Sequence, residues 1–286
     1  MVNKNISPNG WQIGRGVARD EYIRAVVADP GRLRPRAEIF FRHSLPAIAR
    51  MHCRNPAIRH VVAASDRLPD WLLNRLDEAA GTYSWLEVQK IGYDDDWNWR
   101  VGLVQALRSL GQELSKNVFL LTSCRLDDDD VLAPEFAEAV EAYIKPPYRG
   151  FCISFTRGYC GLWNERASDY SAFVHWKYPM NSVGLAYVGE YDVSKGVWNT
   201  PHLGPPGSHV KVDEEVPTIL DGRRRMFIRS LHSSNDVNEV RRAARRKHQL
   251  LRSIFGTRRY DRDHRVLAKN KPADLDEVQL AFPTLA

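Results

Sequence analysis

The sequence predicts an α/β protein whose mostly parallel, Rossmann-related sheet is flanked by helices. Three observations predict it. Short apolar runs alternate with amphipathic stretches over the first half of the chain, and strands joined in this way by helices form parallel sheets covered on both faces. The 286 residues are enough for a sizeable core. Hydrophobic residues at 43% and charged residues at 27% are ordinary for a globular protein.

The expected elements follow from these patterns in chain order. The run 58–64 is a buried strand, and Asp70 after Pro69 can begin a helix with apolar residues near the helical period. The run 117–123 is the strongest strand signal, and Pro134 opens a later helix. The other expected elements are a helix over 101–114 and strands over 85–91, 150–155 and 226–231.

Beyond about residue 156 the pattern changes. Helical periodicity fades while glycine, proline and aromatic residues become dense, so we expect an irregular second half. Residues 238–255 read as a basic amphipathic helix. We therefore expect one domain over 1–237, divided into 15–155 and 156–237, followed by a basic extension over 238–286.

The positive charge belongs to one segment rather than to the whole chain. Lys and Arg number 41 against 35 Asp and Glu, which gives +6. The segment Arg241–Arg265 holds ten basic and two acidic residues, a charge of +8, so the remainder carries −2. A basic amphipathic helix is typical of peripheral contact with an anionic membrane surface. A nucleic acid is a rival partner, but the slightly acidic body offers it no groove, and we expect no nucleic acid. A solvated helix that docks on the acidic body is the third interpretation.

The hydropathy of the chain favours a cytoplasmic protein, with possible contact only at the inner face of the cell membrane. No apolar run approaches the roughly 18 residues of a spanning helix, and residues 1–10 have no apolar signal core.

Four consecutive aspartates, Asp127–Asp130, stand a few residues after the strand over 117–123. Adjacent carboxylates repel one another, and a cation or several donors must neutralise them. Such oxygen ligands suit Mn²⁺ or Mg²⁺. The structural alternative is an acidic turn in which one aspartate caps the next helix. The run also fits a phosphohydrolase loop with Asp127 as nucleophile. An EF-hand is excluded, because this segment lacks the glycine and the glutamate that an EF-hand loop requires.

The segment Leu126–Leu132 resembles the Leu-Asp-x-Asp-Asp signature of GT-A glycosyltransferases, and the chain is similar to a bacterial family described as putative rhamnosyltransferases. The resemblance covers roughly 15–240. It rests further on 36–48, on the strand that ends at Ser65-Asp66, on 180–188 and on 230–236. It implies a GT-A-like fold in which 15–155 binds a nucleotide-sugar donor and 156–237 faces the acceptor. It also implies a divalent cation between the donor diphosphate and Asp127 and Asp129, with Asp128 near the ribose or behind the ligands.

The resemblance extends to further site residues. Asp66 would hold the nucleotide base, or else form a turn, and Arg100 would pair with a phosphate. His232, after the last strand, would be a third metal ligand, although a single histidine is more often structural. Asp213 or Glu214 would be the base that accepts the proton of the acceptor hydroxyl, or else they are surface acids.

These observations favour a metal-dependent glycosyltransferase that moves a sugar, with rhamnose as the candidate, from a nucleoside-diphosphate donor to a cell-envelope or capsular glycan. The glycan would be free or lipid-linked. The presence of a candidate base indicates that the configuration at the anomeric carbon of the sugar is inverted. Two alternatives stay open. One is the phosphohydrolase that uses Asp127, and the other is a non-catalytic protein that binds glycans or membranes.

Overall fold

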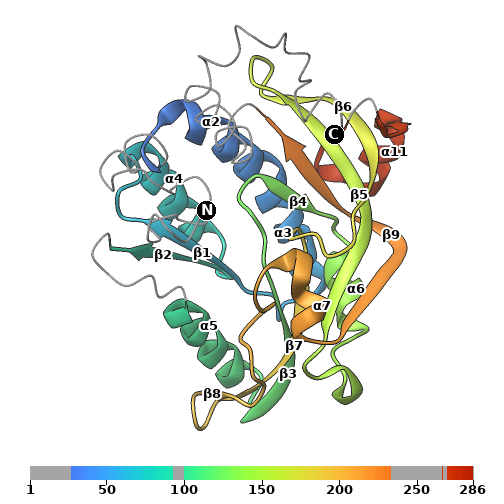
Figure 1. Cartoon of the computed structure of the whole chain (residues 1–286). Coiled ribbons are helices and arrows are strands. Elements are labelled where there is room, and N and C mark those ends of the chain that lie inside the picture. Colours follow the sequence, from blue (N-terminus) through green and yellow to red (C-terminus); the bar gives the residue numbers. More distant parts are fainter. Residues whose placement is uncertain (1–26, 93–99, 233–265, 267–268, 286) are drawn as a thin grey trace, which may run out of the picture.

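A computed structural model of the chain describes residues 27–92, 100–232, 266 and 269–285. In Figure 1 a small pair of strands and its helices lie on one side, a large sheet lies on the other, and a long helical segment runs between them. The mixed α/β class expected from the sequence is confirmed.

The first half follows the expected alternation closely. Strand β1 (His60–Ser65) leads through α4 (Asp70–Thr82) to β2 (Leu86–Ile91), and α5 (Arg100–Glu113) leads to β3 (Val118–Cys124). Strands β1 and β2 pair in parallel from His60–Leu86 to Ser65–Ile91. On α4, Leu72 and Leu76 are fully buried four residues apart, because i and i+4 share one helix face.

The large sheet contains β10-β6-β5-β7-β3 in that order, with β9 beside β5 and β4 beside β9. Its bounds are β4 (Asp130–Leu132), β5 (Cys152–Asn164), β6 (Asp169–Lys177), β7 (Ala186–Asp192), β8 (Val197–Trp198), β9 (Thr218–Leu231) and β10 (Pro272–Ala273). Strands β3, β5, β8, β9 and β10 run in one direction, against β4, β6 and β7 in the other.

Neighbouring strands of this sheet are mostly antiparallel, which corrects the expectation of a mostly parallel sheet. Among the described strands of the large sheet, only β5 and β9 pair in parallel. The second half is also more regular than its composition suggests. Instead of an irregular segment, β5 and β6 form a long antiparallel pair over 157–177, and β7 pairs with β3 along its whole length. Antiparallel strands need only short connections, so the helical periodicity disappears without the sheet ending.

The segment before β1 is a continuous helix from Pro30 to Arg54. It has three parts: α2 (Pro30–Ile39), a π-helical turn η2 (Phe40–Ser44) and α3 (Leu45–Arg54). Pro46 has no N–H for the carbonyl of Arg42, and its ring would clash there. The helix widens just before it, and the Leu45 N–H donates to the Phe40 carbonyl instead. Such π-turns are frequent at functional sites.

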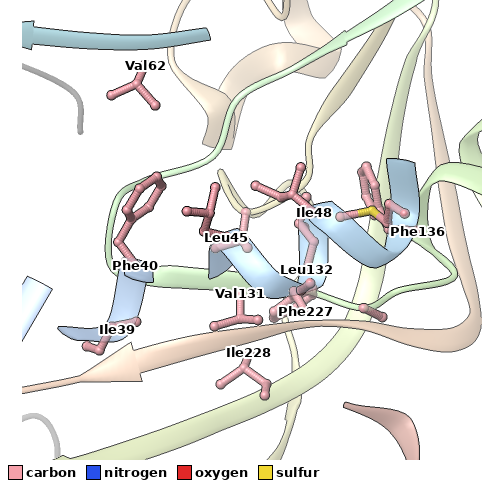
Figure 2. Close-up of a cluster of buried hydrophobic side chains, with 14 of the residues drawn as sticks. Ile39, Phe40, Leu45, Ile48, Val62, Val131, Leu132, Phe136, Phe227 and Ile228 are labelled. Carbon is pink, nitrogen blue, oxygen red and sulfur yellow. The ribbon is translucent and has the colours of Figure 1, made fainter. Parts of the chain in front are cut away.

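The main core lies where this helix meets both sheets. Figure 2 shows Ile48 of α3 close to Leu132 of β4, with Val62 of β1 on the opposite side of the helix and Ile228 of β9 beneath. All four side chains are buried. The helical segment therefore joins the β1–β2 pair to the β4–β9 edge of the large sheet.

The C-terminal residues fold back onto the body. Strand β10 pairs with β6, and α11 (Leu275–Ala281) buries Val278 in the main core together with Phe282. The described part of the predicted extension, 269–285, thus belongs to the same packed unit. The basic helix over 238–255 lies outside the described residues. Within the described chain, no helix has both the length and the apolar character needed to span a membrane.

Candidate functional site

The aspartates Asp127–Asp129 form the connection between β3 and β4, and Asp130 is the first residue of β4. Backbone pairing fixes both ends of this loop. The Arg125 N–H donates to the Leu185 carbonyl at 3.4 Å, and the Gly184 N–H donates to the Arg125 carbonyl at 3.3 Å. At the other end, Asp130 pairs with Arg229 in the β4–β9 ladder. The predicted strand before these carboxylates is confirmed, but it is only partly buried, because Phe119 alone among its seven residues is buried.

Two side chains from distant parts of the chain converge on this loop, which we call the aspartate loop (residues 127–130). Arg36 of α2 contacts Asp128 Oδ1 through Nη1, and its Nη2 lies 2.9 Å from Asp129 Oδ2. His232, directly after β9, donates from Nε2 to the same Asp129 Oδ2 at 2.9 Å. The four side chains are at most 9% exposed. Buried carboxylates of this kind persist because cationic donors compensate them.

Asp127 and Asp130 flank this buried group and differ from it. Asp127 is the most exposed of the four, at 31%, and its Oδ1 accepts from Arg125 Nη2 at 3.0 Å. Asp130 is buried, and its Oδ1 accepts from the Ser230 N–H at 3.1 Å. Burial, and then the neighbouring Asp129 carboxylate, raise the pKa of Asp130 well above its usual range. Only Asp127 therefore presents a solvent-facing carboxylate to a ligand.

The aspartate loop offers few protein ligands to an ion such as Mn²⁺ or Mg²⁺. Among the described residues, no group of three or more His, Cys, Asp or Glu side chains is arranged to hold a metal ion. Asp129 Oδ2 and His232 Nε2 are 2.9 Å apart, close to the roughly 3 Å between neighbouring ligands of an ion with bonds of about 2.1 Å. Mg²⁺ commonly takes one or two protein ligands and completes its shell with water and substrate phosphates. The oxygen and imidazole donors thus suit such an ion.

The nucleotide-side residues lie at the expected chain positions. Asp66 follows β1 at the carboxyl end of the β1–β2 pair, where its N–H donates to the Ile91 carbonyl at 3.0 Å. Its side chain is partly exposed and lies 3.9 Å from Arg67 Nε. Arg100 is the first residue of α5, but its side chain is not among the described ones. The loop 93–99 before it also lies outside the described residues.

The two acids expected to act as base lie on α7 (Val212–Glu215). Both are exposed, and Glu214 pairs with Lys211 at 3.1 Å. Within the described residues, neither Asp213 nor Glu214 forms a hydrogen bond or ion pair with the aspartate loop. A contact does link their region to the segment before β7, since His209 Nδ1 lies 2.8 Å from the Met180 carbonyl. The structure brings His232 to Asp129 but leaves these two acids apart from them.

Sequence reasoning missed Arg36 and Ser44. Arg32 and Arg36 are four residues apart among apolar residues and both are buried, so two arginines on an apolar helix face were the available signal. Ser44, in the π-turn, donates from Oγ to the Asp130 carbonyl. No local pattern could identify their partners, because Arg36 and Asp128 are 92 residues apart in the chain.

Comparison with known proteins gives one family. No curated protein matches the chain. A family model described as putative rhamnosyl transferase matches residues 14–244, which is more than half of the chain. The matched span includes Arg36, the aspartate loop and His232, whereas α11 lies beyond it. The chain therefore belongs to the family described as putative rhamnosyl transferases, a family of glycosyltransferases.

Proposed function

We propose that the protein transfers a sugar from a nucleoside-diphosphate donor to a hydroxyl group of a glycan acceptor of the cell envelope or capsule, with inversion at the sugar. The family supports sugar transfer, and rhamnose is the candidate sugar. The observation that carries the proposal is the aspartate loop, where Asp129 meets both Arg36 and His232 beside the exposed Asp127.

In the proposed site Asp129 and His232 would hold a divalent cation, Mn²⁺ or Mg²⁺, and Asp127 would become its third ligand by leaving Arg125, since the three side chains are not arranged around one point without the ion. When bound, such a cation stabilises the negative charge that develops on the leaving diphosphate. The exposed Asp127 would meet the cation from the solvent side, and the buried Asp129 and His232 from the protein side. Asp128, held by Arg36, supports the loop from behind.

The remaining site residues bind the donor and remove the proton. Asp66 holds the nucleotide base from the end of β1, and Arg100 pairs with a donor phosphate at the start of α5. Asp213 or Glu214 accepts the proton of the attacking hydroxyl, as a direct displacement at the sugar carbon requires. Their exposure supports this role, because an acceptor glycan can reach α7 from solvent.

The acceptor is a glycan that is free or attached to a lipid at the inner face of the cell membrane. The +8 charge of Arg241–Arg265 supports contact with such a surface, since each basic residue near an anionic membrane contributes about 1 kcal/mol.

The test is a thermal-unfolding panel of nucleoside diphosphates with and without Mn²⁺. A ligand that binds only the folded protein raises its unfolding midpoint, and we expect one nucleotide to do so only together with Mn²⁺. Asp129→Ala should remove that shift and the transfer activity, while Asp77→Ala should keep both, because Asp77 of α4 pairs with Lys90 and not with the aspartate loop.

Stabilisation by a nucleotide that is indifferent to chelator and to Asp129→Ala would contradict the metal-dependent transferase. A beryllofluoride adduct on Asp127 would instead indicate the phosphohydrolase.

A further inference from the structure

Arg36 occupies the position of a cation at the buried side of the aspartate loop. Its guanidinium group contacts Asp128 with one nitrogen and lies 2.9 Å from Asp129 Oδ2 with the other. The side chain is 5% exposed and comes from α2, an element that the sequence did not connect with the loop. The planar guanidinium group holds its donors in a fixed fork that suits two carboxylates, whereas a lysine would present a single point charge.

Asp129 Oδ2 already has two donors. Arg36 Nη2 and His232 Nε2 are each 2.9 Å from it, and a carboxylate oxygen offers about two acceptor positions. A divalent ion on this oxygen would also stand within a few ångströms of the guanidinium charge, in a buried environment where repulsion is strong. Arg36, as placed, and a divalent cation therefore exclude each other at Asp129 Oδ2.

We propose that Arg36 is a positioning residue that acts as a resident counter-cation for Asp129. It holds the loop while no donor is bound, and it gives up Asp129 Oδ2 when a divalent cation binds there. This inference rests on the proposed function, because the exchange matters only if a cation binds there with a donor diphosphate. Its consequence is that the cation alone binds weakly, since it must first displace a buried ion pair.

A diphosphate changes this balance. It brings negative charge and further oxygen ligands to the cation, and it offers the displaced guanidinium a new partner of the kind that arginine binds well. Cation and diphosphate should then bind cooperatively, and Arg36 would be the origin of the coupling. The coupling is mutual, so the diphosphate would likewise bind more tightly in the presence of the cation.

The experiment measures Mn²⁺ binding to the full chain by electron paramagnetic resonance of the free ion, without nucleotide. The proteins compared are wild type, Arg36→Gln and, as matched control, Arg75→Gln. Arg75 of α4 pairs with Glu38, which lies on the same helix as Arg36. We expect Arg36→Gln to bind Mn²⁺ about tenfold more tightly than wild type, a factor in line with one charged hydrogen bond. Arg75→Gln should behave like wild type. A purely structural role for Arg36 would not raise the affinity.

Thermal unfolding with Mn²⁺, with inorganic pyrophosphate and with both gives the second readout. Wild type should be stabilised by the two together by more than the sum of the separate shifts, and Arg36→Gln should lose this excess. The double variant Arg36→Gln/Asp129→Asn should lose the gained Mn²⁺ affinity.

Equal Mn²⁺ affinity of wild type and Arg36→Gln would overturn the inference and leave the proposed function intact. No Mn²⁺ binding by any variant, even with pyrophosphate, would overturn the metal-dependent function and the inference with it. If Arg36→Gln does not fold, Arg36→Met replaces it, because methionine also removes the charge and fills a buried site of this kind with an unbranched apolar side chain. A Mn²⁺ affinity of Arg36→Met no higher than that of wild type would then overturn the inference.

Discussion

Asp129 illustrates which residue-scale contacts a sequence can reveal. The proximity of His232 and Asp129 could be anticipated, because the family resemblance assigned both residues to one metal site. The contact with Arg36 could not, since an arginine in a helix has no local signature for a partner 93 positions away. The raised pKa of Asp130 depends on burial that only the packed β4–β9 pair creates.

At the same scale, the candidate base can be tested by conservative substitution. We expect Asp213→Asn or Glu214→Gln to lower kcat by about a hundredfold or more, because a positioned base contributes roughly 10²–10⁴ to the rate. The KM for the donor should stay unchanged. Glu215→Gln, on the same short helix, is the control. The measurement is release of the nucleoside diphosphate selected by the thermal panel; unchanged kcat for both variants would mean that the base lies elsewhere.

Asp221 on β9 provides a pH-dependent contribution to stability. Its carboxylate, 4% exposed, accepts from Arg223 Nη2 at 2.6 Å and from Tyr143 Oη at 2.9 Å. The hydrogen bonds from Arg223, followed by the other partners, lower the pKa of Asp221 to about 2. In the unfolded chain the pKa of an aspartate carboxyl group is about 4. The contribution is therefore complete above about pH 4 and disappears as the pH falls toward 2.

Asp221→Asn should accordingly lower the free energy of unfolding at pH 6 by about 1–2 kcal/mol, a value reduced because Arg223 is largely exposed. The difference from wild type should shrink by pH 3. Urea unfolding at both pH values measures it, and a difference that stays constant with pH would contradict this origin.

At the scale of elements, the sequence predicts best where strands and helices alternate. The helix α4 begins at the expected Asp70, and the strands at 60–65, 86–91 and 118–124 match their expected positions within two residues. The long helix over 30–54 was not anticipated, because Pro35 and Pro46 interrupt its pattern. The strands β6 and β7 were not anticipated either, since the glycines and prolines around them obscured the aromatic and β-branched residues that favour strands.

The C-terminal helix α11 gives the element-scale prediction. Phe282, which ends it, is fully buried against the ring of Tyr159, and Glu277 accepts from the Tyr159 hydroxyl at 2.9 Å. Phe282→Ala should lower the free energy of unfolding by about 3–5 kcal/mol. Leu280→Ala, on the same helix but 86% exposed, should change it by less than about 0.5 kcal/mol. Urea unfolding of both variants checks this. Equal effects would mean that α11 does not pack on the body in solution.

At the scale of the whole molecule, charge is separated along the chain. The proposed membrane contact predicts that the full chain sediments with vesicles that contain anionic lipid and not with neutral ones, and that salt weakens binding by screening. Replacing Arg241, Arg242, Arg245 and Arg246 by Gln should remove the binding without changing donor binding, which the thermal panel measures. Equal binding to neutral vesicles would contradict an electrostatic contact.

The docking of the C-terminal residues has a consequence for the covalent integrity of the chain. Leu231, at the end of β9, and Val266 belong to the same small hydrophobic cluster, and β10 and α11 are then fixed by pairing with β6 and by Val278 and Phe282. Leu231 and Val266 thus lie at one site of the body, although they are far apart in the sequence. A single proteolytic cut between His232 and Val266 would yield two fragments that stay associated through the core. An unchanged size of the folded protein in solution would therefore not prove that its polypeptide chain is uncut.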